Sequence, residues 1–281
     1  MTDAIDDQHA VAHLLGSAQA ILFDFDGPIC DLFRGASTAT VAAKIKRRAR
    51  RSWKTLAPGV EKCDDSHHIL RRLRDMYDDA SGRPVPKPLS RRPIARAERI
   101  VARQELRAVR TAALTPGAVT LVDLLHQLDL PLVVVSNNSE RPIKRFLKRQ
   151  EMHENFVAVF GRDPENAGFM KPHPDCLLRA FRHLSINGPN CVLIGDQLTD
   201  LKAAQEAGTS FLGFTQDGAR AREMVGSGAD AVVTSYAPVI AAARDLLADR
   251  TGSAHSEDSS SSFHTESNQA CMLSTKTAPG P

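Results

Sequence analysis

The sequence predicts an α/β fold, in which a doubly wound, Rossmann-like parallel sheet forms a core and a helical cap is inserted into it. Three observations support this prediction. Short apolar runs alternate with stretches of helical periodicity. Polar residues follow each of the clearest runs directly, and a basic helical segment interrupts the alternation after the first run. Such an alternation is typical of a sheet whose strands are joined by helices that cover both faces.

The clearest predicted strands are 20–23, 132–135 and 191–194, which are short and rich in aliphatic residues. Runs of this kind are typical of strands that a parallel sheet buries on both faces. Weaker apolar runs predict further strands at 156–160, 211–214 and 231–234. The helices expected between the strands span 118–128, 140–150, 174–184, 199–207 and 219–225. We therefore expect the core to comprise residues 15–31 and 116–250.

The predicted cap, residues 32–115, is helical in character and strongly basic. Its helices are expected at 41–54, 67–79 and 93–111, with a proline-rich break, GRPVPKP, at 82–88. The cap contains 21 Lys and Arg against 8 Asp and Glu, whereas the remainder of the chain contains 15 against 25. A positive field of this size favours anionic ligands.

One part of the cap, KIKRRARRSWK at 44–54, combines cations with Trp53 and could follow a nucleic-acid backbone. We prefer the interpretation that this segment is a solvated cap helix that steers small anions. The partner expected from the charge is therefore a small anionic substrate, and a nucleic-acid partner is not expected.

Composition and cysteine content predict a globular protein of the cytoplasm. The chain has 281 residues, 42% of them hydrophobic, which is enough for a substantial core. Its five cysteines are scattered and form no CxxC pair, which argues against a disulfide framework or a zinc site. The start, MTDAIDDQHA, is acidic, and no apolar stretch approaches the roughly 20 residues that span a bilayer. Residues 251–281 are rich in Ser and Thr, and we expect them to be disordered.

Candidate functional residues follow the predicted strands. Ligands of a doubly wound sheet bind beyond the carboxyl ends of its strands, so the polar residues at those ends are the ones to consider. A single Asp in such a place is more often a helix cap than a catalyst, and it is the joint occurrence that indicates a site. In chain order, the set is Asp24, Asp26, Gly27, Ser136, Asn137, Lys171, Gly195, Asp196 and Asp200.

Several carboxylates at one edge of a sheet would repel one another unless a cation neutralised them. Ligands that offer only oxygen suit a hard ion such as Mg²⁺. With Mg²⁺ and a lysine nearby, a carboxylate can approach a phosphate despite the like charge. The residue types therefore point to magnesium-dependent phosphoryl transfer.

Four motifs in this order resemble the haloacid dehalogenase-like hydrolase superfamily, in the branch whose helical cap follows the first strand. They are DFDGPICD at 24–31, LVVVSNN at 132–138, Lys171 in MKPHPD, and GDQLTDLKAA at 195–204. The resemblance covers roughly residues 18–250, and four motifs in the right order are far more specific than any one of them. It implies a phosphatase similar to phosphoglycolate phosphatase, acting on a small phosphomonoester.

The resemblance also implies roles for the individual residues. Asp24 would be the nucleophile that forms an aspartyl-phosphate. Asp26 would protonate the leaving alcohol and then activate the hydrolytic water. Ser136 and the Asn137 amide would hold phosphoryl oxygens, and Lys171 would pair with both the nucleophile and the phosphate. The Mg²⁺ ligands implied are Asp24, the backbone carbonyl of Asp26, Asp196 and, directly or through water, Asp200.

One residue departs from the family pattern, because Pro28 occupies a position that the family usually fills with Thr. Proline fixes φ and donates no N–H, so we expect reduced or narrowed activity. Three alternatives stay open: a phosphomutase, a phosphonate hydrolase, which would require a cap lysine at the site, and a non-catalytic polyanion-binding protein. The basic cap favours substrates with a second anionic group. The cap lysines considered are Lys44, Lys46, Lys54, Lys62 and Lys87.

Overall fold

The computed structural model describes residues 5–33, 36–81 and 89–261, and its core is an α/β sandwich. Six strands form one sheet in the order β5-β4-β1-β6-β7-β8, and every neighbouring pair is parallel. This arrangement confirms the predicted fold class. The strands are β1 (Ala20–Phe23), β4 (Leu132–Val135), β5 (Phe156–Phe160), β6 (Cys191–Gly195), β7 (Ser210–Phe214) and β8 (Ala231–Val233).

The two faces of the sheet are covered by different helices because the side chains of each strand alternate between them. Ile21 and Phe23 of β1 pack into one apolar cluster, and Ala20 and Leu22 pack into another. The helices of the first face are α1 (Gln8–Ser17), α6 (Ala118–Gln127), α7 (Glu140–Arg149) and α11 (Ala237–Ser261). Those of the second are α8 (Asp175–Leu184), α9 (Leu198–Ala207) and α10 (Gly218–Gly226). Two short 3₁₀ turns, η1 (Ala167–Phe169) and η2 (Gly188–Asn190), complete the core.

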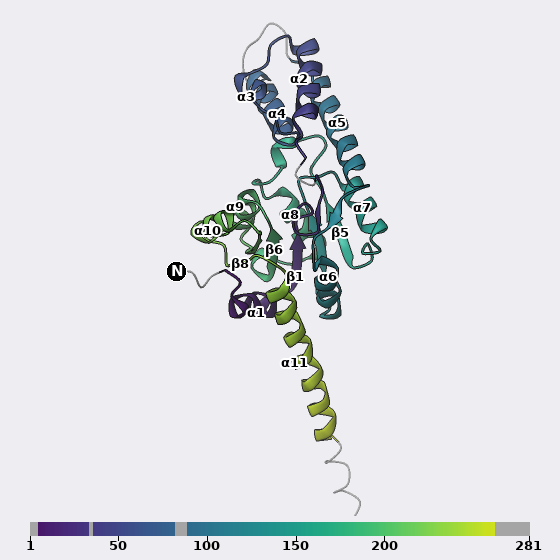
Figure 1. The fold of residues 1–281 in the computed structure, drawn as a ribbon, viewed down its shortest axis with the longest axis vertical. Helices are drawn as coiled ribbons and strands as arrows, with labels where there is room; N and C mark the ends of the chain where they lie inside the picture. The colour runs from purple at the N-terminus through teal and green to yellow at the C-terminus, as the bar shows by residue number, and fades with distance from the viewer. Residues whose placement is uncertain (1–4, 34–35, 82–88, 262–281) are drawn as a thin grey trace, which may run out of the picture.

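The cap stands above the carboxyl ends of the strands, as Figure 1 shows. It consists of α2 (Ala39–Trp53), α3 (Pro58–Glu61), α4 (His68–Ser81) and α5 (Arg92–Ala108). These helices bury an apolar cluster of their own, to which η1 and Met170 of the core also contribute. At the base of the cap, the short strands β2 (Cys30–Asp31) and β3 (Ala113–Leu114) pair antiparallel. The chain therefore enters and leaves the cap through adjacent strands.

Some elements differ from the sequence-based expectations. The sequence did not predict helices α1 and α11 or the strand pair β2–β3. Helix α11 packs on α1 and on α6. We expected disorder from residue 251, whereas the helix α11 continues through Ser261. The rest of the expected tail, 262–281, and the proline-rich break at 82–88 lie outside the described residues. Across the described ranges, no helix is both long and apolar enough to cross a membrane.

Candidate active site

Asp24 lies where β1 ends, between the ends of the neighbouring strands. Its backbone N–H donates to the Ile194 carbonyl (2.9 Å), which holds it against β6. Its side chain is nearly buried, with the residue only 7% exposed. The Nζ atom of Lys171 lies 3.0 Å from Asp24 Oδ1 and 2.6 Å from Asp200 Oδ1, and it donates to the Val135 carbonyl at 3.2 Å. The ammonium group of Lys171 thus contacts Asp24 after β1, Asp200 after β6 and the last residue of β4, Val135.

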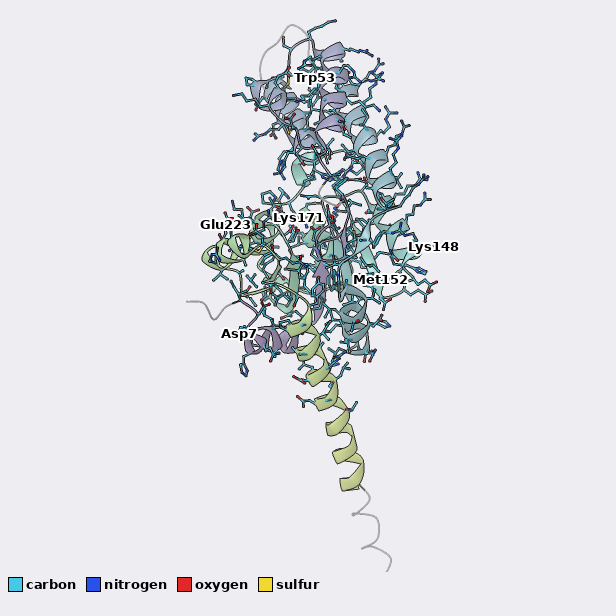
Figure 2. All side chains as sticks on the ribbon, viewed as in Figure 1. Asp7, Trp53, Lys148, Met152, Lys171 and Glu223 are labelled. Carbon is cyan, nitrogen blue, oxygen red and sulfur yellow. The ribbon has the colours of Figure 1, made fainter. Side chains whose placement is uncertain are left out.

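Neighbouring carboxylates keep Lys171 in its charged form. Burial alone would lower the pKa of this lysine, but the carboxylates of Asp200 and Asp24 outweigh burial and leave its pKa above the ordinary value. Lys171 is therefore a fixed cation at the wall of the site. Figure 2 shows it between the cap and the core.

Three carboxylates gather beside this lysine. Asp24, Asp196 and Asp200 each offer an oxygen within 4.8 Å of the others. Burial and the charges of Asp200 and Asp24 raise the pKa of Asp196 to about 8, and burial also raises the pKa of Asp200. The Oδ1 atom of Asp196 is buried and accepts no hydrogen bond from any described residue, and the buried Oδ1 atom of Asp24 faces the Lys171 ammonium group. A buried carboxylate oxygen without a partner, as in Asp196, fits a hard cation such as Mg²⁺.

The glycines of the site make room for these carboxylates. Gly27 has φ +104°, and a Cβ atom there would lie 2.5 Å from Asp196 Cγ. A Cβ atom on Gly195 would lie 2.6 Å from Asp200 Cβ. Asp200 has two structural tasks at once, because its Oδ2 accepts from the Gln197 N–H (3.0 Å) as part of the capping box of α9 while its Oδ1 pairs with Lys171.

Asp26 lies two residues after Asp24 and combines a raised pKa with a hydrogen bond to the backbone. Its Oδ1 accepts a hydrogen bond from the Leu32 N–H at 2.8 Å. Burial raises the pKa of Asp26 to about 6; the Leu32 hydrogen bond opposes this effect, and the nearby charge of Asp24 adds to it. A carboxyl group with a pKa near neutrality can act both as a proton donor and as a proton acceptor.

The segment after β4 is ordered by its own side chains. The Ser136 hydroxyl donates to Asn138 Oδ1 (3.1 Å), and the Asn138 N–H donates to Ser136 Oγ (3.2 Å). The Asn137 side chain holds the backbone of Lys171: its Oδ1 accepts from the Lys171 N–H (2.7 Å), and its Nδ2 donates to the Lys171 carbonyl (3.2 Å). This use of the Asn137 side chain was not expected from the sequence, because its partner lies 34 residues away.

A buried ionic network joins this segment to the cap. Glu105 of α5 is completely buried and accepts hydrogen bonds from Arg162, from the side chain of Asn138, and from both the N–H and the hydroxyl of Ser139. The Nε2 atom of His67 lies 2.7 Å from Glu105 Oε1. Burial would raise the pKa of Glu105, but Arg162 and His67 outweigh burial and lower it to about 2. Arg162 also pairs with Glu98 at 2.7 Å. The network was not expected from the sequence, because Glu98, Glu105 and Arg162 each resemble an ordinary surface charge there.

A cavity of about 710 Å³ lies between the cap and the core. All seven candidate side chains line it: Asp24, Asp26, Ser136, Asn137, Lys171, Asp196 and Asp200. The cap contributes His67, His68 and Arg71 to its wall, and Arg71 also donates to the Lys171 carbonyl at 2.9 Å. No cap lysine of the described residues lines the cavity. Cys63, Asp64, Asp65, His67 and His68 lie close together in the sequence, but they are not among the groups of described residues that could share a metal ion.

The loop that contains Pro28, the residue that departs from the family pattern, is held to the core by hydrogen bonds to the carbonyl groups of Gly27 and of Pro28 itself. The Tyr236 hydroxyl donates to the Pro28 carbonyl (2.8 Å), and the Thr115 hydroxyl donates to the Gly27 carbonyl (2.6 Å). The Gly27 N–H donates to the Cys30 carbonyl at 2.7 Å and closes the turn. Proline is thus accommodated in a turn whose carbonyl groups accept hydrogen bonds from side chains just after β3 and just before α11.

A parallel sheet, an inserted helical cap and acidic residues at the strand ends together define a doubly wound α/β protein with a capped ligand site. The family model for haloacid dehalogenase-like hydrolases matches residues 18–208, and the chain belongs to this family. The match begins just before β1 and ends with the glycine that caps α9. It therefore includes every candidate site residue.

Several curated proteins are similar in sequence. The chain is 34% identical to a phosphoglycolate phosphatase of Neisseria gonorrhoeae, over 33% of this chain and 38% of that protein. It therefore spans well under half the length of that relative. Over 78% of this chain and 93% of the relative, it is 29% identical to protein CbbY of Cereibacter sphaeroides. It is 24% identical to the probable phosphatase IndB of Dickeya dadantii, over 81% of this chain and 94% of that one.

Solved structures share the fold. CbbY from Rhodobacter sphaeroides, in complex with phosphate, superposes with a TM-score of 0.53 at 20% identity, covering 78% of this chain and 95% of that one. A predicted phosphoglycolate phosphatase from Haemophilus somnus superposes with a TM-score of 0.53 at 17% identity, covering 80% and 97%. At these identities the likeness establishes the fold alone.

Proposed function

We propose that this hydrolase is a Mg²⁺-dependent phosphatase that cleaves a small phosphomonoester through an aspartyl-phosphate on Asp24. The observation that carries the proposal is the arrangement around Asp24: a nearly buried carboxylate 3.0 Å from a fixed ammonium group, beside a carboxylate of Asp196 with a partnerless oxygen, at the wall of a cavity. The relatives named as phosphatases agree with it.

The residues suggest how the reaction proceeds. An oxygen of Asp24 attacks phosphorus, the bond from phosphorus to the leaving oxygen breaks, and Asp26 gives its proton to that oxygen. Asp26, now ionised, takes a proton from a water molecule that attacks the phosphorus and releases phosphate and free Asp24. Lys171 stabilises negative charge in both steps. Asp24, Asp196 and the Asp26 carbonyl would hold Mg²⁺, with Asp200 beside them, and the ion would supply charge neutralisation at the phosphoryl oxygens.

The cavity favours a substrate that carries a second anionic group. The cap residue Arg71 supplies a cation at its wall. A solved structure of CbbY contains xylulose-1,5-bisphosphate, and several relatives are phosphoglycolate phosphatases. Substrates of this class place a phosphate or a carboxylate some distance from the phosphorus that is attacked. We propose the same class for this chain.

The lysine positions argue against a phosphonate hydrolase. Lys46 is turned inward and donates to the Glu61 carbonyl (2.9 Å) and to Asp64 (3.0 Å). Lys44 lines a groove on the outside of the cap. Neither Lys54 nor Lys62 lines the active-site cavity, and Lys87 lies outside the described residues.

The decisive experiment measures phosphate release from phosphoglycolate, xylulose-1,5-bisphosphate and simple alkyl phosphates, with and without Mg²⁺. We expect release that requires the ion and that falls to the uncatalysed background in Asp24→Asn. Asp79→Asn, an exposed carboxylate of α4, is the matched control and should keep full activity. An Asp26→Asn variant should lose about 10²–10⁴-fold. Release that persists in Asp24→Asn would contradict the proposal, and an isomerised phosphorylated product without free phosphate would indicate a phosphomutase instead.

A further inference from the structure

The outer surface of the cap carries two rows of cations that the active site does not use. On α5 the row steps by four, three, four and four residues, which places its members on one face of the helix. On α2 a second row steps by four and three residues. All of these side chains are exposed. The rows are Arg92, Arg96, Arg99, Arg103 and Arg107 on α5, and Lys44, Arg48 and Arg51 on α2.

The acidic residues of the two helices do not neutralise these rows. Helix α2 contains no Asp or Glu. The two acidic residues of α5 are engaged elsewhere, since Glu98 pairs with Arg162 and Glu105 is buried in the network beneath the cap. Among the ion pairs of the described residues, none involves a member of either row. Both helices direct their apolar faces, which include Ile45 and Val101, into the cap cluster. The cations on the opposite faces therefore point to solvent.

The rows meet along two grooves. One groove, of about 230 Å³, is lined by Lys44 and Arg48 of α2 and by Arg96, Arg99 and Arg103 of α5, with Ile100 at its floor. A second groove of about 400 Å³ continues past Lys44 and Arg103 to Arg107. None of these cations lines the catalytic cavity, which takes its cap residues from α4 and the segments before it. Nitrogen-tipped side chains crowd the outer edge of α2 and α5 in Figure 2.

From the sequence, we expected the cations of residues 44–54 to lie on a solvated cap helix that steers small anions. The structure places these cations away from the catalytic cavity, so they need another explanation. The row on α5 extends over about 22 Å, because fifteen residues rise about 1.5 Å each. One strand of a nucleic-acid duplex presents a phosphate about every 3.4 Å along its axis, so the row faces about six of them.

We propose that the grooved outer face of α2 and α5 binds double-stranded nucleic acid through its phosphate backbone. Arginine predominates in the rows, and its planar guanidinium group binds phosphate oxygens in a bidentate way. A single strand would require exposed aromatic side chains for base stacking, but Trp53 of α2 is buried and donates to the Ser90 carbonyl (2.9 Å). The exposed large apolar residues of the described chain all lie outside the cap helices, so nothing on this face would insert into a lipid surface.

The test is fluorescence anisotropy with a labelled duplex DNA of mixed sequence and about 25 base pairs, titrated between about 50 and 200 mM salt. We expect binding that weakens with salt, with a slope of log K against log salt of about −4.5, which corresponds to about five neutralised phosphates. The triple variant Arg96→Glu/Arg99→Glu/Arg103→Glu should bind at least about a hundredfold more weakly at low salt. Its hydrolysis of phosphomonoesters should equal that of the wild type.

A matched control keeps the test specific to this face. The variant Arg182→Glu/Lys202→Glu/Arg244→Glu changes the net charge equally but on α8, α9 and α11, and it should bind the duplex within about threefold of the wild type. Equal loss in both triple variants, or binding that does not depend on salt, would overturn the proposal. Binding of polyglutamate or of phosphatidylserine vesicles without binding of the duplex would also overturn it, and would assign the face to an acidic protein or to a membrane.

Discussion

At the scale of single residues, the site depends on how closely the backbone approaches the carboxylates. Gly27 is the clearest case, because its positive φ and its contact with Asp196 both exclude a side chain. At Asp200, by contrast, the side chain itself is essential, because it caps α9 and also pairs with Lys171. A sequence pattern can point to such residues but does not show how many tasks each has.

Replacing Gly27 with Ala should damage the site more than the fold. The new Cβ atom would lie within 3 Å of the Asp196 side chain at a backbone angle that L-residues rarely adopt, so we expect a cost of about 1–3 kcal/mol in the free energy of unfolding. Asp196 would have to move, and hydrolysis should fall by at least about a hundredfold. Urea denaturation and phosphate release measure the two effects.

Gly226→Ala is the control for this substitution. Gly226 ends α10, and a Cβ atom there would meet nothing within 4 Å. This variant should be as stable as the wild type or slightly more stable, with unchanged activity. Normal activity in Gly27→Ala would show that Asp196 is not held where the proposed reaction needs it.

At the scale of elements, the positions of Asp24, Ser136 and Asp196 could be predicted because each follows an apolar run that is typical of a strand. Asp24, Ser136 and Asp196 are adjacent to such runs, and the parallel sheet brings their ends together. The connection between the cap and the core could not be predicted in this way. Glu105 and Arg162 lie 57 residues apart, and each is one charge among many on its own segment. Only the packing of α5 beside the segment after β5, where Arg162 lies, shows that they form a pair.

The buried network should make stability depend on pH. The pKa of Glu105 is lower in the folded chain, about 2, than its ordinary value, so its ionised form stabilises the fold. This contribution, on the order of 3 kcal/mol, is complete above about pH 4.5 and is lost as the pH falls toward 2. A Glu105→Gln variant should therefore be less stable at pH 7, and the difference from the wild type should shrink below pH 4.5.

Chemical denaturation at several pH values measures this difference. The control is Glu61→Gln, which removes only the surface pair with Arg50 and should change stability little. A Glu105→Gln variant as stable as the wild type at pH 7 would show that the network adds nothing to the association of the cap with the core.

At the scale of the whole molecule, the repulsion among Asp24, Asp196 and Asp200 should make folding sensitive to Mg²⁺. An ion that binds only the folded chain stabilises it by about 2.7 kcal/mol at a concentration 100 times its dissociation constant. We expect the melting temperature to rise with Mg²⁺ in the wild type and not in Asp196→Asn. Thermal scans in Mg²⁺ and in a chelator provide this readout without any substrate, and an equal rise in both proteins would place the ion elsewhere.

The adjacent strands β2 and β3 have a consequence for how such proteins diversify. Because Cys30 pairs with Leu114 and Asp31 with Ala113, the insertion begins and ends at neighbouring points of the chain. The catalytic sheet is therefore complete without the inserted segment, and a short turn could bridge the gap. One hydrolytic core can in this way exchange its cap as a module, acquiring a new surface or a new substrate range without any change in the threading of its strands.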